Sequence, residues 1–218
     1  MNKVYRLVIF DWEGTLGDTI GHVLCVVDKE SKKLKFGDLD ESLARENACL
    51  GLVTAIRKLY SHLSLYQQEV LLEAVQTSLA KDAMEVCLIP GSKEVLEAMR
   101  AKGLTLAVAT NKGQQSLQRA IVASGLDGYF KTTRSAGQVP AKPCPQMLEE
   151  ILSECGVTAS EALMVGDSPT DIDMATQIGV DAVGIDFYHQ QTESLVAAGA
   201  LHVFDDYQKL AQFLQVYK

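Results

Sequence analysis

The chain contains no proline before Pro90 and no run of basic residues. Its 28 aspartates and glutamates outnumber its 20 lysines and arginines, so its formal net charge is −8. Because a protein that follows a phosphate backbone needs a basic surface, nucleic acid is not an expected partner. No window reaches the roughly 18 apolar residues of a membrane span, and the apolar stretch after Lys3 ends at Asp11, too early for a signal peptide. A membrane partner is therefore not expected either.

The five cysteines are odd in number, and no two of them form a C-x-x-C pair. Without an export signal we expect reduced thiols, most of which act as small core hydrophobes. The sequence therefore favours a cytoplasmic protein, and it leaves the oligomeric state open.

Apolar periodicity divides the chain near Pro90. Between the first apolar run and Pro90, apolar side chains recur at three- and four-residue steps over residues 43–59 and 65–83, which predicts a small helical bundle. Beyond Pro90, short apolar runs alternate with helical patterns, as in βαβ units. A chain of 218 residues is long enough for both parts. The expected domains are an α/β core, residues 1–17 and 90–218, and an inserted helical domain, residues 18–89.

The α/β part predicts a doubly wound parallel sheet with helices on both faces. The predicted strands are Val4–Phe10, Leu104–Ala109, Ala162–Val165 and Ala182–Ile185, with Tyr129–Thr132 and His202–Phe204 as candidate edge strands. The predicted helices are Lys93–Lys102, Gly113–Ser124, Gln146–Cys155 and Thr170–Ile178, with a closing helix after Asp206. Such a sheet binds its ligands beyond the carboxyl ends of its strands, so the functional site is expected there.

Polar residues stand where the first two strands end. The first strand runs directly into Asp11 and Glu13, and Gly14 then permits a sharp turn. The second strand ends at Thr110 and Asn111, whose hydroxyl and amide would form an anion cradle together with free N–H groups at a helix start. The same two residues also suit a simple helix N-cap.

Two later segments carry further charged residues. Lys142 lies in the proline-stiffened loop Pro140–Pro145, and the alternative to a site residue is an ordinary solvated lysine. Asp167 follows the third predicted strand, and Asp171 lies where it would also favour a helix N-terminus. Three or more carboxylates on one sheet edge need a cation, and oxygen ligands without His or Cys select Mg²⁺. The hydroxyl, the N–H groups and the lysine suit a phosphoryl group.

Four motifs, in this order, resemble those of the haloacid dehalogenase superfamily in its phosphoglycolate phosphatase-like branch. They are D-W-E-G-T-L-G-D-T at Asp11–Thr19, A-T-N-K at Ala109–Lys112, A-K-P-C-P at Ala141–Pro145 and V-G-D-S-P-T-D at Val165–Asp171. The resemblance covers nearly the whole chain. It implies a Mg²⁺-dependent phosphohydrolase that acts on a small phosphorylated metabolite through an aspartyl-phosphate intermediate.

The resemblance also implies a role for each motif residue, with Asp11 as the nucleophile. The implied metal-binding residues are Asp11, Glu13, Asp167 and Asp171, the phosphate-binding residues are Thr110, Asn111 and Lys142, and the catalytic residues are Asp11, Glu13 and Lys142. Glu13 is a departure, because the family pattern has aspartate at this place. Its backbone carbonyl can still bind a metal, but roughly an ångström of misplacement at its carboxylate could cost on the order of a hundredfold in rate.

The helical insertion resembles a cap, which in this family closes over the site and accompanies small substrates. About 30 residues separate the second and third motifs, too few for the larger type of cap. The candidates for binding the far end of a substrate are Arg45, Arg57 and Lys58, near residues 50–52. A solvated helix face is the alternative for each of them. Gly17 and Pro90-Gly91 bracket the insertion and are candidate hinges.

Two alternatives to a phosphatase remain open. A phosphosugar mutase would carry the same motifs and keep the phosphoryl group on the sugar, whereas a phosphoryl-ligand sensor would have lost turnover through Glu13. A dehalogenase is disfavoured, because halide displacement does not require the metal and phosphate site that Lys142, Asp167 and Asp171 would build. A signalling receiver domain is disfavoured, because its phosphorylated aspartate lies on a later strand and no helical cap interrupts its fold.

Overall fold

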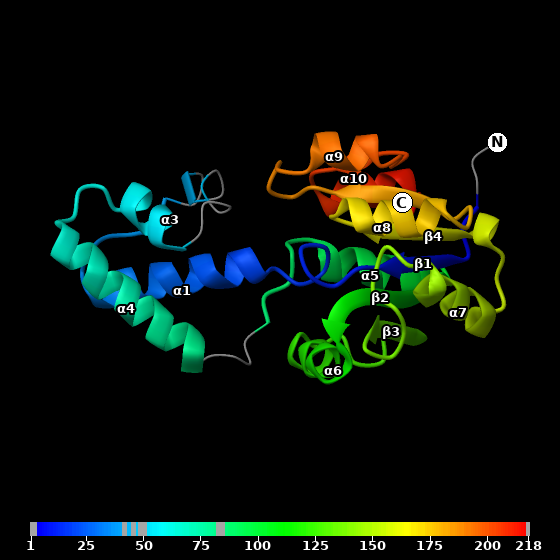
Figure 1. Cartoon of the computed structure of the whole chain (residues 1–218), viewed down its shortest axis with the longest axis horizontal. Coiled ribbons are helices and arrows are strands. Elements are labelled where there is room, and N and C mark those ends of the chain that lie inside the picture. Colours follow the sequence, from blue (N-terminus) through cyan, green and yellow to red (C-terminus); the bar gives the residue numbers. More distant parts are fainter. Residues whose placement is uncertain (1–3, 41–42, 45–46, 48–51, 82–85, 217–218) are drawn as a thin grey trace. The chain divides into compact units, whose positions relative to one another are not determined.

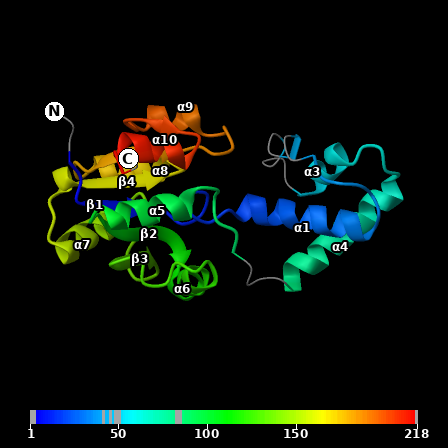
Figure 2. The same cartoon turned by 180° about the vertical axis from the view of Figure 1, so that it is seen from behind.

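The structure, a computed structural model, describes residues 4–40, 43–44, 47, 52–81 and 86–216. The chain divides into two compact units (Figures 1 and 2). The first unit comprises Met1–Asp18 and Leu88–Lys218, and the second comprises Thr19–Cys87. These bounds lie one or two residues from the domain limits expected from the sequence. Among the described helices, none combines the length and the apolar character that crossing a membrane requires.

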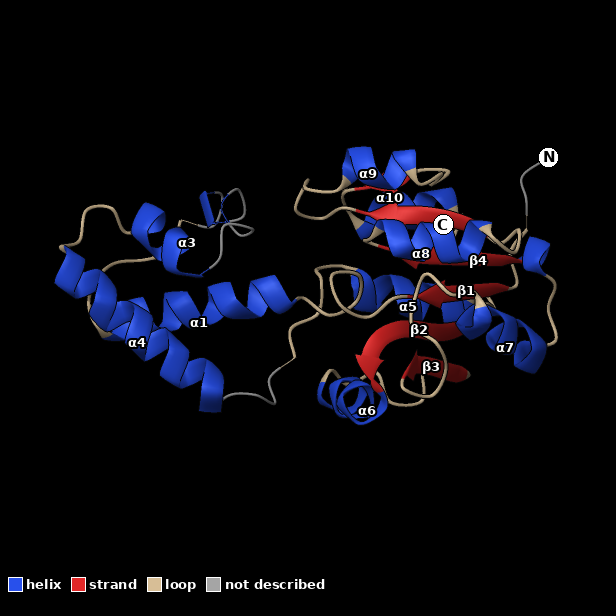
Figure 3. Cartoon of the chain, viewed as in Figure 1, coloured by secondary structure: helices blue, strands red, loops and turns tan. Residues whose placement is uncertain are grey.

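In the described residues, the first unit is built on one six-stranded sheet with the order β3-β2-β1-β4-β5-β6 (Figure 3). All neighbouring strands are parallel. The strands are β1 (Leu7–Phe10), β2 (Thr105–Gly113), β3 (Thr132–Ala136), β4 (Ala162–Gly166), β5 (Asp181–Ile185) and β6 (Val203–Phe204). The order reverses between β1 and β4, and this switch point is where doubly wound sheets bind ligands. The predicted α/β fold class is confirmed.

Helices follow most of the strands, as the alternating sequence pattern predicts. They are α5 (Ser92–Ala101), α6 (Gln114–Ala123), α7 (Gln146–Cys155), α8 (Pro169–Thr176), α9 (Thr192–Ala197) and α10 (Tyr207–Phe213). Four of them match the predicted helices to within two residues, and α10 is the predicted closing helix. No apolar periodicity predicts α9, which is short and has one buried residue, Leu195.

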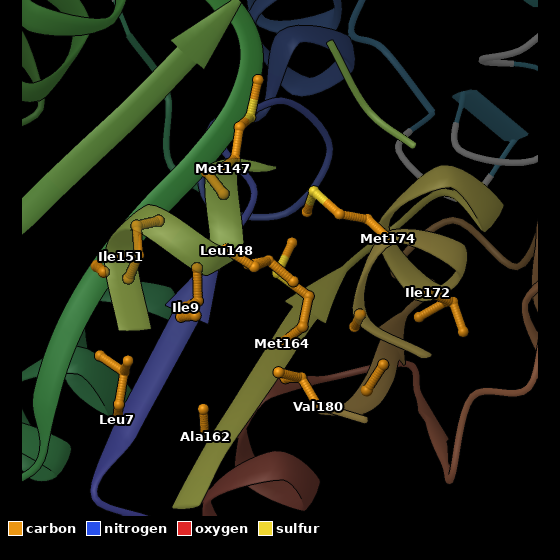
Figure 4. Packing of buried hydrophobic residues seen from close by; sticks show 14 of the residues in the cluster. Leu7, Ile9, Met147, Leu148, Ile151, Ala162, Met164, Ile172, Met174 and Val180 are labelled. Atoms are coloured by element: carbon orange, nitrogen blue, oxygen red, sulfur yellow. The ribbon is translucent and has the colours of Figure 1, made fainter. Parts of the chain in front are cut away.

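The central strands are apolar on both faces because both faces are covered. Leu7 and Ile9 of β1 pack with Met164 of β4 and with residues of α7 and α8, including Met147 and Ile172 (Figure 4). Since side chains alternate along a strand, the two other residues of β1 point to the opposite face, and they are also fully buried. This burial on both sides explains the uninterrupted apolar run of β1.

Three strand predictions were wrong in their bounds. The first strand begins at Leu7 rather than at Val4. The strand predicted at Tyr129–Thr132 is instead Thr132–Ala136, and Tyr129 lies in the preceding loop, where its N–H donates to the carbonyl of Leu126. The residues of β3 are mostly polar, so no apolar run marks this edge strand. The second strand does not end at Ala109 but continues to Gly113, with a register shift against β3 after Thr110. Pairing with β3 extends it, and pairing is not visible in a local pattern.

The second unit is helical, as its periodicity predicts. Its helices include α1 (Thr19–Lys33), α3 (Leu52–Leu59) and α4 (Leu65–Lys81). Their apolar faces meet in a core of Val26, Val27, Ile56, Tyr60, Leu71 and Val75. Burial of these stripes, rather than helix propensity, is what stabilises helices of this length. The predicted candidate Arg45, with Leu50 and Gly51, lies outside the described residues.

Candidate active site

Asp11 lies at the switch point between β1 and β4. Its backbone N–H donates to the carbonyl of Val165 at 2.9 Å, which extends the parallel pairing of the two strands beyond Phe10. The side chain of Asp11 is only 13% exposed. Asp11 therefore stands at the sheet edge where a ligand is expected, with its carboxylate largely withdrawn from water.

Lys142 reaches the same point from the loop between β3 and α7. Its side chain is 2% exposed, and its Nζ lies 2.8 Å from Asp11 Oδ1 and 2.5 Å from Asp171 Oδ1. Its backbone N–H donates to Asn111 Oδ1 at 2.9 Å, which ties the loop to the end of β2. The solvated-lysine interpretation is therefore wrong. The ammonium group is buried, and two carboxylates compensate for the water that it has lost.

Asp171 uses its two carboxylate oxygens differently. Oδ1 faces Lys142, while Oδ2 accepts hydrogen bonds from the N–H and the hydroxyl of Ser168 at 3.1 and 2.9 Å, in a capping box at the start of α8. Gly166 leaves room for this side chain, because a Cβ at position 166 would lie 2.4 Å from the Cβ of Asp171. The helix-start interpretation of Asp171 is correct, and it does not exclude Asp171 from the site.

Asp11, Asp167 and Asp171 form a carboxylate cluster in which one oxygen of each residue lies within 4.8 Å of the others. Within the described part of the chain, no histidine or cysteine joins it. Asp11 Oδ1 is buried and accepts no hydrogen bond of good geometry, although it is ion-paired with Lys142. Oxygen donors alone, with one buried carboxylate oxygen short of a hydrogen bond, fit a hard divalent cation such as Mg²⁺.

The crowded charges shift the pKa values in this cluster. Burial raises the pKa of Asp167 from its usual value of 3.8 to about 7, and the carboxylates of Asp11 and Asp171 add to the rise. Burial also raises the pKa of Asp11, against the opposing effect of Lys142. Burial lowers the pKa of Lys142, but the two carboxylates outweigh this effect, so its pKa is raised and the ammonium stays charged. One lysine thus faces more negative charge than it can balance.

The turn after Asp11 is held against Asp167. Thr15 Oγ1 donates to Asp167 Oδ1 at 3.0 Å. Gly14 has a φ of +73°, and a Cβ at this position would lie 2.1 Å from Asp167 Oδ2, so both backbone conformation and space require glycine. Tyr207 of α10 is buried and donates its hydroxyl to the carbonyl of Thr15 at 2.6 Å. No sequence motif indicates Tyr207, because this residue lies far from the motifs in the chain.

Glu13 lies apart from the carboxylate cluster. Its side chain is 43% exposed and forms an ion pair with Nζ of Lys112, which lies in the last part of the neighbouring strand β2. Of the four metal-binding residues predicted, the structure brings together the carboxylates of Asp11, Asp167 and Asp171. A contribution from Glu13 through its backbone carbonyl stays a prediction. Lys112 is part of the second motif, yet the resemblance implies no role for it.

Thr110 and Asn111 do not stand at a helix start. Because β2 continues to Gly113, that glycine is the N-cap of α6, and it makes no side-chain capping bond. The interpretation of Thr110 and Asn111 as a helix cap is therefore wrong, whereas their role in a phosphate cradle stays a prediction. Thr110 is buried and its Oγ1 accepts a hydrogen bond from the N–H of Lys112 at 3.2 Å, while Asn111 holds the loop of Lys142.

Comparison with known proteins agrees with this geometry. Residues 8–185 match the family model described as haloacid dehalogenase-like hydrolase. A phosphoglycolate phosphatase of Rhodospirillum rubrum is 29% identical, over 96% of this chain and 90% of its own, and one of Synechococcus elongatus is 26% identical, over 88% and 89%. The fold is similar to that of a HAD family hydrolase from Deinococcus radiodurans, solved with bound phosphate and sodium, with a TM-score of 0.67, 19% identity, and coverage of 98% of this chain and 97% of that one.

The raised pKa of Asp167 predicts how the metal-free protein responds to pH. Its carboxyl group ionises near 3.8 when unfolded and near 7 when folded, so the folded state binds the proton more tightly and loses stability as the pH rises through this window. Between pH 5 and 7.5, denaturant unfolding in EDTA should show a fall of about 2 kcal/mol that Asp167→Asn removes. Asp173→Asn, an exposed change on α8, is the matched control. If the free energy of unfolding of Asp167→Asn still fell with pH as it does in the wild type, the prediction would be contradicted.

The close approach of Gly14 to Asp167 predicts a second effect on stability. Gly14→Ala should lower the free energy of unfolding by about 1–3 kcal/mol, because it adds both a strained φ and a clash. Gly103→Ala is the matched control, because Gly103 has a φ of +80° but no atom within 4 Å of an added Cβ. Denaturant unfolding should show the larger loss at Gly14, and equal losses would mean that the clash with Asp167 is relieved without cost.

Proposed function

We propose that this chain, which belongs to the haloacid dehalogenase-like hydrolase family and is a phosphatase, is a cytoplasmic Mg²⁺-dependent enzyme for a small phosphorylated metabolite. Phosphoglycolate or a related phosphate ester is the proposed substrate, because proteins named phosphoglycolate phosphatase are similar to the chain over most of its length. The observation that carries the proposal is the buried Lys142 ammonium between Asp11 and Asp171, next to Asp167. This arrangement supports binding of a cation and a phosphoryl group side by side.

Asp11 would act as the nucleophile. A carboxylate oxygen of Asp11 attacks phosphorus, the bond from phosphorus to the ester oxygen breaks, and an aspartyl-phosphate forms. The departing oxygen takes a proton from Glu13. In the second step a water molecule attacks phosphorus and gives a proton to Glu13, the bond to the Asp11 oxygen breaks, and inorganic phosphate leaves. Glu13, protonated at the start, is protonated again at the end, so the two steps together restore the starting state of both residues.

Lys142 and Thr110 would assist at the phosphoryl group. The Lys142 ammonium lies 2.8 Å from Asp11 Oδ1, so it can compensate for the charge that concentrates between the nucleophile and the phosphoryl oxygens. Thr110 offers a buried hydroxyl at the same sheet edge, and Asn111 holds the lysine loop in place. These groups would act without moving, because the sheet and the hydrogen bonds already fix them.

Asp11, Asp167 and Asp171 would hold Mg²⁺, with the backbone carbonyl of Glu13 as a further ligand. When bound, the cation reduces the repulsion between the anionic nucleophile and the anionic phosphoryl group. The carboxylates fit this task, because the cluster has an excess of negative charge and Asp11 Oδ1 lacks a hydrogen bond of good geometry.

The second unit would act as a cap that selects the substrate and excludes water during phosphoryl transfer. Arg57 and Lys58 are exposed on α3 and stay candidates for substrate contact, although Lys58 also donates to Asn47 Oδ1 at 3.2 Å. Gly17 pairs with Leu88 in an antiparallel bridge, so the two connections to the cap run side by side. This pairing supports a hinge in which both connections bend together.

Release of inorganic phosphate tests the proposal. With Mg²⁺, the protein should release phosphate from one or more members of a panel of small phosphate esters, and EDTA should abolish the release. Asp11→Asn should fold normally and lose turnover, because the amide is close in shape but is not a nucleophile. Exposed Asp173→Asn serves as the control. Phosphate retained on a rearranged sugar would favour the mutase, and binding without turnover would favour the sensor.

The role of Glu13 is tested by Glu13→Gln. If Glu13 transfers protons, the substitution should lower the rate by about 10²- to 10⁴-fold at saturating Mg²⁺, because the amide can neither donate nor accept the proton. Steady-state rates on the same substrate provide the measurement. Equal rates for the wild type and Glu13→Gln would remove Glu13 from the mechanism while leaving the phosphatase itself intact.

A further inference from the structure

We propose that Lys112 is a positioning residue: its ammonium holds Oε1 of the Glu13 carboxyl group, so that Oε2 can carry the proton that the leaving-group oxygen takes. The inference rests on the proposed function, because it concerns the first step of that reaction. It deepens the function by adding a residue that the motif roles leave unassigned. The carrying observation is the ion pair between Lys112 Nζ and Glu13 Oε1.

The sheet brings these two residues together. In the parallel pair of β1 and β2, Phe10 ends β1 beside Val108, and Glu13 follows in the turn after β1 while Lys112 lies farther along β2. Strand β2 can extend that far because it pairs with β3 as far as Gly113, with a register shift after Thr110. The N–H of Lys112 also donates to Thr110 Oγ1 at 3.2 Å. The position of Lys112 is thus set by the sheet.

The longer side chain of glutamate increases the number of positions that the carboxyl group of residue 13 can occupy. Glutamate has one more rotatable bond than aspartate, so a carboxylate at position 13 can occupy more positions and is less often in the productive one. The Lys112 side chain is 26% exposed and that of Glu13 is 43% exposed, and exposed ion pairs of this kind contribute little to folding stability. Restricting the Glu13 carboxylate is the effect that such a pair can still have.

Lys142 cannot replace Lys112 in this task. Its ammonium is buried and held by Asp11 and Asp171 at 2.8 and 2.5 Å, which directs it to the nucleophile side of the site. Lys112 is bound instead to the residue proposed to transfer the proton. The two lysines therefore have different roles: Lys142 compensates charge at the reacting phosphoryl group, and Lys112 orients Glu13.

The leaving group distinguishes positioning of Glu13 from a direct contact between Lys112 and phosphate. Benzyl phosphate and p-nitrophenyl phosphate are similar in shape, but benzyl alcohol needs a proton to leave and p-nitrophenolate does not. The measured quantity is kcat/KM, which includes steps only up to departure of the leaving group, so the later hydrolysis of the aspartyl-phosphate does not enter it. A residue that acts through Glu13 should matter far more for benzyl phosphate.

We expect Lys112→Met to lower kcat/KM for benzyl phosphate by about 10- to 100-fold, and by about tenfold less for p-nitrophenyl phosphate. Glu13→Gln should show the same preference, and adding Lys112→Met to Glu13→Gln should cause little further loss, because both changes remove one function. Lys112→Arg, which keeps the charge, should recover most of the activity. Lys209→Met removes a comparable exposed ion pair, with Asp205, and is the matched control.

Three results would overturn the inference: equal losses on the two esters, full activity of Lys112→Met on benzyl phosphate, or losses that multiply in the double variant. Equal losses would instead indicate contact between Lys112 and the phosphoryl group. Thermal unfolding of each variant separates these outcomes from misfolding, and Lys112→Gln serves as a second neutral variant should Lys112→Met unfold. Wild-type protein inactive on every ester would overturn the proposed function, and this inference with it.

Discussion

The ion pairs of the buried Lys142 side chain connect all parts of the candidate site. They join the end of β1, through Asp11, to the start of α8, through Asp171, and the loop that carries the lysine is tied to β2 by Asn111. A buried ammonium is costly unless it is closely paired, so these contacts hold each element in one position. The remaining excess of negative charge, which includes Asp167, is what makes the site suited to a cation.

The strand order explains why these distant segments meet. In a parallel sheet all strands end at the same edge, and the order of this sheet reverses between β1 and β4. The chain leaves β1 through the turn at Gly14 and leaves β4 toward α8, so both segments carry polar residues to this edge. The buried apolar strands fix the position of the backbone, and this also fixes where the polar residues just beyond the strand ends lie.

Two kinds of electrostatic interaction lie side by side at this edge. The carboxylate cluster and Lys142 are buried, and this burial, together with the carboxylates of Asp11 and Asp171, raises the pKa of Asp167 to about 7. The ion pair of Glu13 and Lys112 is partly exposed, so water screens it and it contributes little to folding stability. Its proposed effect is to orient the Glu13 carboxyl group. A reaction that needs fixed charge at phosphorus and a movable proton at the leaving group can use both environments.

The sequence by itself determined the fold class, because buried strands and amphipathic helices leave periodic apolar patterns. It also determined that Asp11, Asp167 and Asp171 would converge, because the first two directly follow strands and the third lies in the first turn of the helix after β4. Only the tertiary structure decided where β3 lies and how far β2 extends, since a polar edge strand is defined by its hydrogen-bonded neighbour and not by its own residues. The same holds for the contacts of Lys112 and Tyr207, because their partners are distant in the chain and only packing brings them together.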